Sequence, residues 1–198
     1  MNEIPTLAEE LARFARLVTT EPRAAMLRLE RGAGALRAAV VFRGCVRGRR
    51  VNAGGPVRVV AEGRISLGDR VQFAGGIIPT ELVARAGAEL VVGEACNFNY
   101  GVSLDATARV RIGARCLFGS MVRVRDAAGT RVAPVEIGDD VWLAHGARVE
   151  PGVTIGAGSV VSAGSVVTAD VPPRSLALGN PATCVPLGAV ARTGGVRR

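Results

Sequence analysis

The stretch VEIGDDVWLAHGARVEPGVTIGAGSVVSAGSVVTADVPPRSLALGNPA, residues Val135 to Ala182, repeats itself every six residues. Read from Ile137, it divides into the blocks IGDDVW, LAHGAR, VEPGVT, IGAGSV, VSAGSV and VTADVP. Each block opens with an aliphatic residue, and its fifth place is small or β-branched. A fixed period of this kind indicates a solenoid, in which short parallel strands stack coil on coil.

The length of the repeat predicts the shape of each coil. A six-residue side spans about 20 Å at the rise of a strand, so three sides close a triangular coil of eighteen residues. The first and fifth places of each block then point into the prism, and residues one coil apart stack at roughly 4.8 Å. Composition fits a thin prism, because hydrophobic residues make up 48% of the chain and aromatic residues only 4%.

The segments IGDDVW, PGVTIGAGSVVSAGSVVTADVPP and GNPA resemble the hexapeptide-repeat acyltransferases, and the closing segment is similar to that of the maltose, galactoside and xenobiotic acetyltransferases. The resemblance implies an all-β solenoid, the left-handed parallel β-helix. That handedness departs from the usual right-handed crossover, so the resemblance supplies it and the period does not. It also implies a homotrimer with sites in the clefts between adjacent prisms.

The coil openings can be followed upstream as pairs of an aliphatic residue and glycine. These pairs begin at Leu67, Val92, Ile112, Ile137 and Ile155, at intervals of 25, 20, 25 and 18 residues. Each interval is eighteen plus an insertion of seven, two, seven or none. The chain should therefore have at least five coils, with the seven-residue insertions near residues 75–87 and 125–134.

The sequence pattern predicts that the chain divides into three parts. Residues 1–37 should form an N-terminal helical cap, 38–182 the β-helix and 183–198 a C-terminal tail. Within the cap, Thr6–Val18 has an apolar helical face, and a second helical piece runs from Pro22 to Arg31. A cap of this kind would cover the open strand edge of the prism, although an autonomous interaction helix is the alternative.

His145, the single histidine of the chain, is the third residue of the block LAHGAR and should face outward. Its place is similar to that of the working histidine in the lipid A acyltransferases, amino-sugar N-acetyltransferases and γ-carbonic anhydrases. An imidazole can take the proton of an attacking hydroxyl or amine and return it to a leaving thiolate. The resemblance thus makes His145 the expected catalytic base, and a plain surface histidine is the alternative.

The coil arithmetic predicts which residues stack with this histidine. The second blocks of successive coils start at Phe98, Phe118, Leu143 and Val161, so their third places form one outward column, Tyr100, Ser120, His145 and Ala163. Ser120 is then a candidate to orient the imidazole or contact substrate, or an ordinary polar residue of the face.

The segment CNFNYGVSLD is similar to the NFN…LD segment of the sugar O-acetyltransferases. Carried over, it makes Asn97 and Asn99 candidate catalytic positioners and Asp105 a candidate for binding the acceptor. A role in capping the solenoid corners is the alternative for both asparagines. Trp142 could flank the pantetheine channel, or pack against a neighbouring subunit.

The chain departs from the acetyltransferases in the loop at residues 125–134, RDAAGTRVAP. Those enzymes place a catalytic histidine there after an aspartate, whereas this loop keeps Asp126, a candidate substrate-binding residue, and has no histidine. Either His145 has taken over as base, or the chemistry differs, or the protein is a non-catalytic trimeric scaffold or binding module.

The resemblance implies a donor but no permanently bound cofactor. Acetyl-CoA or another acyl-CoA would serve as co-substrate, an acyl-carrier protein being possible, and the final coils would hold it through Ala163, Thr168, Pro172 and Arg174. The acceptor would be a hydroxyl or amine of a small molecule such as a sugar or specialised metabolite. A net charge of +8 suits cofactor phosphates.

The remaining features argue against other classes. The basic residues lack the interleaved aromatic platform of a nucleic-acid binder. One histidine cannot supply a three-histidine zinc site, and Cys96 and Cys116 fall on inward places, where core packing explains them. Nothing resembles a signal peptide or a membrane-spanning run, so we expect a cytoplasmic protein without membrane contact.

Overall fold

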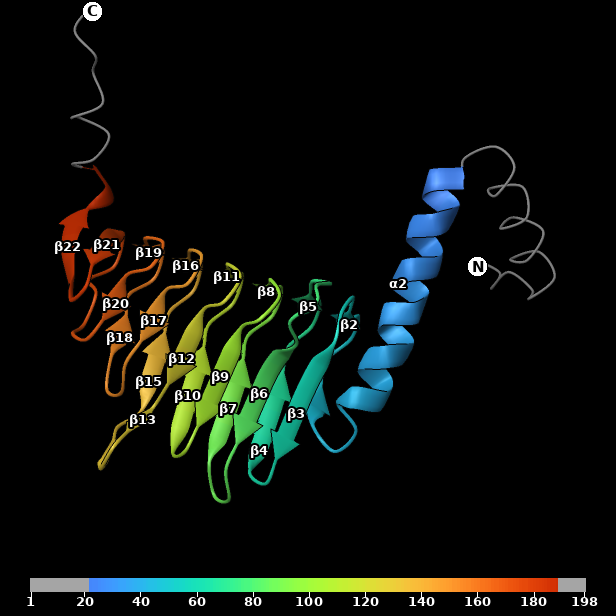
Figure 1. Ribbon diagram of the computed structural model, residues 1–198, viewed down its shortest axis with the longest axis horizontal. Coiled ribbons are helices and arrows are strands. Elements are labelled where there is room, and N and C mark those ends of the chain that lie inside the picture. Colours follow the sequence, from blue (N-terminus) through green and yellow to red (C-terminus); the bar gives the residue numbers. More distant parts are fainter. Residues whose placement is uncertain (1–21, 189–198) are drawn as a thin grey trace, which may run out of the picture.

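A computed structural model describes residues 22–188, which wind into a left-handed parallel β-helix closed at one end by a helix (Figure 1). Three parallel sheets form its sides. Sheet A contains β1 (Val46–Arg47), β4 (Arg64–Leu67), β7 (Glu89–Val92), β10 (Arg109–Ile112), β15 (Val135–Ile137) and β18 (Thr154–Ile155). Sheet C contains β3 (Val57–Ala61), β6 (Thr80–Ala84), β9 (Ser103–Ala106), β12 (Arg123–Arg125), β17 (Arg148–Val149) and β20 (Val166–Val167).

Sheet B forms the third side and also ends the solenoid. It contains β2 (Asn52–Ala53), β5 (Gln72–Phe73), β8 (Asn97–Phe98), β11 (Leu117–Phe118), β16 (Trp142–Leu143), β19 (Val160–Val161), β21 (Ser175–Gly179) and β22 (Ala182–Pro186). The last strand turns back antiparallel to β21. Residues 183–186, expected in the tail, therefore belong to a strand, because the chain reverses at Gly179 and pairs with itself.

The register of sheet A matches the predicted coils. Leu67 pairs with Val92, Val92 with Ile112, Ile112 with Ile137, and Ile137 with Ile155. The prediction of at least five stacked coils is confirmed. The first and fifth places of all six quoted blocks are buried, each side chain being at most 3% exposed.

The core consists of apolar side chains from all three sheets, stacked in columns along the prism axis. Phe42, Phe73, Phe98 and Phe118 stack on one another with ring centroids 5.2, 5.1 and 4.5 Å apart, the last three from successive strands of sheet B. The serines at inward places have backbone partners, as in Ser159 Oγ, which donates to the carbonyl of Pro172 at 2.8 Å. The prism is thus filled mainly by aliphatic residues with one aromatic column.

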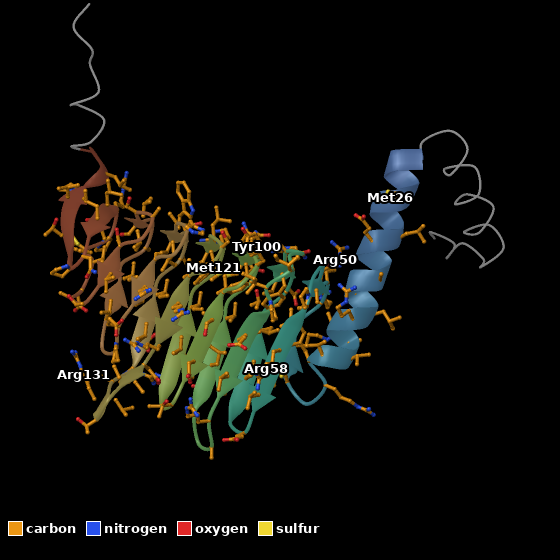
Figure 2. The ribbon with its side chains drawn as sticks, viewed as in Figure 1. Met26, Arg50, Arg58, Tyr100, Met121 and Arg131 are labelled. Carbon is orange, nitrogen blue, oxygen red and sulfur yellow. The ribbon has the colours of Figure 1, made fainter. Side chains whose placement is uncertain are left out.

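The two seven-residue insertions leave the prism differently. The second forms a hairpin of β13 (Ala127–Ala128) and β14 (Arg131–Val132), which projects from the body with Arg131 on it (Figure 2). The first is divided. Phe73, Leu82 and Val92 are equivalent inward positions of sheets B, C and A, which the repeat would place six residues apart. The first interval is nine residues and the second is ten. Three extra residues therefore lie in the connection before sheet C, and four lie in the connection after it.

The helix differs from its predicted extent. α2 runs from Pro22 to Val41 as one helix of 20 residues, where the sequence indicated an end at Arg31 and strands from Ala38. Gly32 and Gly34 are poor helix formers, but Gly34 is buried against the Asn52 side chain, so the small residue lets α2 approach β2. Ala38 and Phe42 are buried on the prism end. The predicted helix at Thr6–Val18 lies outside the described residues.

The outward and inward residues of β11 should differ sharply in their effect on stability. Phe118 is 3% exposed and stacks on Phe98, whereas its neighbour Leu117 faces outward and is 47% exposed. We expect Phe118→Ala to lower the free energy of unfolding by about 3–5 kcal/mol, because it opens a cavity in the column. Leu117→Ala should change it by about 0.5 kcal/mol or less. Urea denaturation of the two variants measures the difference, and similar losses would contradict this core.

Candidate active site

His145 lies in the turn that joins β16 to β17, at the edge between sheets B and C. The turn depends on Gly146, whose φ of 66° lies in the left-handed region that favours glycine. Gly101, Met121 and Gly164 adopt the same conformation at the same edge of other coils. This shared backbone makes the edge a regular stack of turns, each preceded by an outward residue.

The stacking of these turns confirms the predicted column. The amide of Gly146 donates to the carbonyl of Ser120 at 2.9 Å, and that of Gly164 donates to the carbonyl of His145 at 2.8 Å. Figure 2 shows Tyr100 and Met121 along this same edge, where the amide of Met121 donates to the carbonyl of Tyr100 at 3.1 Å. The column consists of Tyr100, Ser120, His145 and Ala163.

Ser120 contacts the imidazole directly. Its Oγ lies 2.8 Å from Nδ1 of His145, and Ser120 is only 9% exposed while His145 is exposed. The hydrogen bond can run in either direction, depending on the tautomer. When Nδ1–H donates to Ser120 Oγ, Nε2 keeps its lone pair, which is the form a general base requires. The serine therefore holds the ring by one nitrogen and leaves the other for chemistry.

Three of the predicted residues line a hollow of about 460 Å³ on the outer face of sheet B. Asn97, Asn99 and Trp142 share it with Gly119, which precedes Ser120. Both asparagines also bond to the backbone, since Asn97 Nδ2 donates to the carbonyl of Ala95 at 3.3 Å and Asn99 Oδ1 accepts from the amide of Tyr100 at 2.8 Å. They combine the corner-capping role with exposure to the hollow.

A second hollow, of about 530 Å³, lies on the outer face of sheet C. It reaches the histidine edge at Gly101 and Met121 and includes Asp105. Asp105 Oδ2 accepts from Arg85 at 3.0 Å, whereas Oδ1 is buried without a hydrogen-bond partner among residues 22–188. The Ser120–His145 pair thus lies between two hollows, with Asn97 and Asn99 on one side and Asp105 on the other.

Asp126 does not line either hollow, which corrects its expected contact with substrate. Its side chain is fully buried, and its carboxylate accepts from the amides of Thr107, Ala108 and Arg109 at 2.7, 2.7 and 2.6 Å. Those amides belong to the preceding coil, where β9 turns into β10. The loop aspartate therefore holds a corner of the solenoid together.

The four residues expected to hold the cofactor fall on different parts of the prism. Ala163 continues the histidine column and is exposed. Thr168 follows β20 on the side of sheet C, while Pro172 and Arg174 lie at the edge between sheets A and B, where Arg174 has a left-handed φ of 55°. Pro172 and Arg174 thus share one edge, whereas Ala163 and Thr168 lie on other parts of the coil, so one protomer does not bring these four together.

The cysteines of the core confirm their predicted packing role. Cys96 and Cys116 are fully buried, and their thiols donate to the carbonyls of Gly113 and Gly138, each at 3.1 Å. The hydrogen bond with the Cys96 thiol, together with burial, raises the pKa of Cys116 above its ordinary value. Within residues 22–188, no group of three or more histidine, cysteine, aspartate or glutamate side chains is placed to hold a metal ion.

Sequence reasoning missed two residues of the sheet C hollow, Arg123 and Arg148. A signal for them exists, because the blocks FGSMVR and LAHGAR, which stack in successive coils, both end in arginine. Their third places are Ser120 and His145. The same arithmetic that found the histidine column therefore also finds an arginine pair beside it.

Comparison with known proteins agrees with this geometry. Residues 134–169 match the family described as bacterial transferase hexapeptide, six repeats. Nodulation protein L of Rhizobium meliloti is 36% identical over 119 residues, which are 54% of this chain and 65% of that protein. The first curated relatives matched are named as acetyltransferases, and the chain spans only 24% to 31% of their length.

Two solved structures share the fold. A hexapeptide-repeat acetyltransferase of Vibrio cholerae with acetyl-CoA has a TM-score of 0.54 at 22% identity, covering 93% of this chain and 92% of that one. A variant of GDP-perosamine N-acetyltransferase of Caulobacter crescentus, with CoA and GDP-perosamine, has a TM-score of 0.54 at 28% identity, covering 77% and 65%. Residues 134–169 are thus similar to the bacterial transferase hexapeptide family, and the described residues share the fold of these acetyltransferases.

Removal of the Asp126 carboxylate should destabilise the fold. Asp126→Ala leaves three amides without their acceptor, so we expect the free energy of unfolding to fall by about 3 kcal/mol or more. Asp170→Ala is the matched control, because Asp170 is exposed and its carboxylate accepts from only one amide, that of Thr154 at 2.7 Å. Urea denaturation compares the two, and an Asp126→Ala protein as stable as the control would refute the structural role.

Proposed function

We propose that the protein transfers an acyl group, most simply acetyl, from CoA to a hydroxyl or amine of a small molecule, with His145 as the base. The observation that carries this proposal is the 2.8 Å hydrogen bond between Ser120 Oγ and His145 Nδ1. It holds the one histidine of the chain on an exposed edge between two hollows. The hairpin β13–β14 has no histidine, so the base is supplied instead from the turn between β16 and β17.

The chemistry follows from the state of the two ring nitrogens. With Nδ1–H donating to Ser120, Nε2 accepts the proton of the acceptor hydroxyl or amine as its oxygen or nitrogen bonds to the thioester carbonyl carbon. The C–S bond then breaks, and Nε2–H returns the proton to the leaving CoA thiolate. A positioned base of this kind accelerates such a reaction about 10²–10⁴-fold.

The other residues of the sheet B hollow would position the reactants. Asn97 and Asn99 carry amide groups on the exposed face beside the histidine edge, where an N–H donor can stabilise the oxyanion or bind an acceptor hydroxyl. Trp142, 49% exposed, offers an apolar surface to the pantetheine arm. In this proposal, CoA contacts Ala163, Thr168, Pro172 and Arg174 across subunits, since within one protomer Ala163 and Thr168 lie away from the edge that Pro172 and Arg174 share.

The solved relatives support the choice of donor and acceptor class. The Vibrio cholerae structure contains acetyl-CoA, and the Caulobacter crescentus structure contains CoA and a nucleotide-linked sugar. We infer a sugar or a similar polyhydroxylated metabolite as acceptor. We also infer a homotrimer, whose subunit clefts complete the site, acting in the cytoplasm. Within residues 22–188, no helix is long and apolar enough to cross a membrane.

Loss of the imidazole should abolish most of the activity. We expect His145→Ala to lower kcat/KM at least a hundredfold, measured as CoA release from acetyl-CoA in the presence of a panel of sugars and amino sugars. The fold should persist, because His145 is exposed. Turnover near that of the unaltered protein would reject His145 as the base.

Ser120 should act through the histidine. We expect Ser120→Ala to lower kcat roughly tenfold with little change in KM, because one orienting hydrogen bond is worth about 1.4 kcal/mol. Ser120→Thr keeps a hydroxyl and should recover most of the activity. In the His145→Ala background, Ser120→Ala should have no further effect on kcat, and a full additional loss would show that the serine acts independently.

A measurement of donor binding distinguishes an acyltransferase from a non-catalytic scaffold. Isothermal titration of the purified protein with acetyl-CoA, and separately with CoA, should give measurable heat, and His145→Ala should bind acetyl-CoA as tightly as the unaltered protein. A protein that binds neither ligand contradicts the proposed function and favours a non-catalytic role.

A further inference from the structure

The outer face of sheet C presents its side chains in two columns that run along the prism. The column nearer the histidine edge contains Glu81, Ser103, Arg123, Arg148 and Val166, and the other contains Val83, Asp105, Arg125, Glu150 and Thr168. Residues in one column come from successive coils and lie about 4.8 Å apart. Each charged group therefore interacts mainly with the side chains above and below it in its own column and with those of the adjacent column.

The charges of the outer column compensate one another. Arg125 donates to the carboxylate of Glu150 from Nε at 3.0 Å and from one Nη to both carboxylate oxygens, at 2.7 and 2.9 Å. Asp105 pairs with Arg85 at 3.0 Å. The remaining carboxylate of this hollow, Glu81, lies 3.5 Å from Arg58. Every acid that lines the hollow thus already has an arginine partner.

The inner column leaves two positive charges uncompensated. Arg123 and Arg148 are direct register partners of β12 and β17, and both are exposed. Neither makes an ion pair or a side-chain hydrogen bond with any residue in 22–188. Like charges placed directly opposite on neighbouring strands destabilise a sheet. An anion bound between the two guanidinium groups would remove that repulsion.

The arginine pair lies within reach of the proposed reaction centre. Arg123 is three residues after Ser120, and Arg148 is three residues after His145, so each pair of backbone positions is separated by at most roughly 10 Å. Both arginines line the 530 Å³ hollow, which extends to the histidine edge at Gly101 and Met121. One small molecule can therefore contact the imidazole and the guanidinium pair together.

We propose that Arg123 and Arg148 form an anion subsite that binds the carboxylate or phosphate of an acidic acceptor. This inference rests on the proposed function and specifies its acceptor as a sugar acid or sugar phosphate. Two guanidinium forks suit the paired oxygens of either anion.

The test is a binding measurement that needs no turnover. Glucose 6-phosphate, glucuronate and glucose are titrated calorimetrically into the unaltered protein, into Arg123→Gln/Arg148→Gln, and into Arg111→Gln. Arg111 is a matched control, exposed on β10 of sheet A without an ion pair in the described residues. We expect at least one anion to bind at least tenfold more tightly than glucose, the double variant to lose that preference, and the control to keep it.

Several results would overturn the subsite. These are no heat with either anion, equal binding of glucose and the anions, or an unchanged preference in the double variant. A double variant that loses affinity for CoA but keeps its affinity for the anions would assign the pair to the donor. A double variant with a smaller assembly in light scattering and no change in anion binding would assign it to a subunit interface.

A charge reversal separates binding from folding. Arg123→Glu replaces the repulsion by an ion pair with Arg148, so the melting temperature should stay the same or rise, while the preference for the anion disappears. Failure of this subsite leaves acetyl-CoA binding and the effect of His145→Ala intact. If the unaltered protein does not bind acetyl-CoA but does bind the anions, the proposed function is contradicted and the anion subsite is not.

Discussion

The structure depends on the hydrogen-bond ladder between successive coils, which fixes every residue directly above its counterpart in the preceding coil. Leu67, Val92, Ile112, Ile137 and Ile155 form one such line inside sheet A. The edges stack as well as the sides, with left-handed residues repeated at the corner between sheets A and B and at the corner between sheets B and C. Extra residues can therefore leave the prism only at an edge, where they do not break the pairing of the sheets.

The same ladder explains how residues far apart in sequence share a site. Ser120 and His145 are 25 residues apart, yet their side chains meet because they occupy equivalent turns of adjacent coils. Arg123 and Arg148 are register partners on β12 and β17 for the same reason. The hollows on the two sides of this edge differ in character, since sheet B presents amides and an indole, whereas sheet C presents guanidinium and carboxylate groups.

The repeat predicted the solenoid, its coil openings and the histidine column from the sequence alone, because a strict period ties sequence position to place on the prism. The repeat could not predict features that depend on contacts outside it. The end of α2 was placed too early, at Arg31, because the repeat does not reveal that Gly34 lies against the Asn52 side chain of β2. Asp126 looked like a loop residue available to substrate, and only the fold shows three amides of the preceding coil converging on it. The interval of 25 residues between Leu67 and Val92 gives only the total length of the first insertion, so it could not predict that the insertion is divided between two edges.

The two ends of the prism differ in a way that bears on how copies of the chain can associate. At one end α2 lies across the first coil, and at the other β22 reverses and pairs with β21, so the terminal strand of sheet B runs against the direction of the rest. A second copy cannot continue the parallel stacking of sheet B at either end without displacing these elements. Head-to-tail growth into fibres is thereby disfavoured, and lateral, self-limiting contacts along the length of the column are favoured instead.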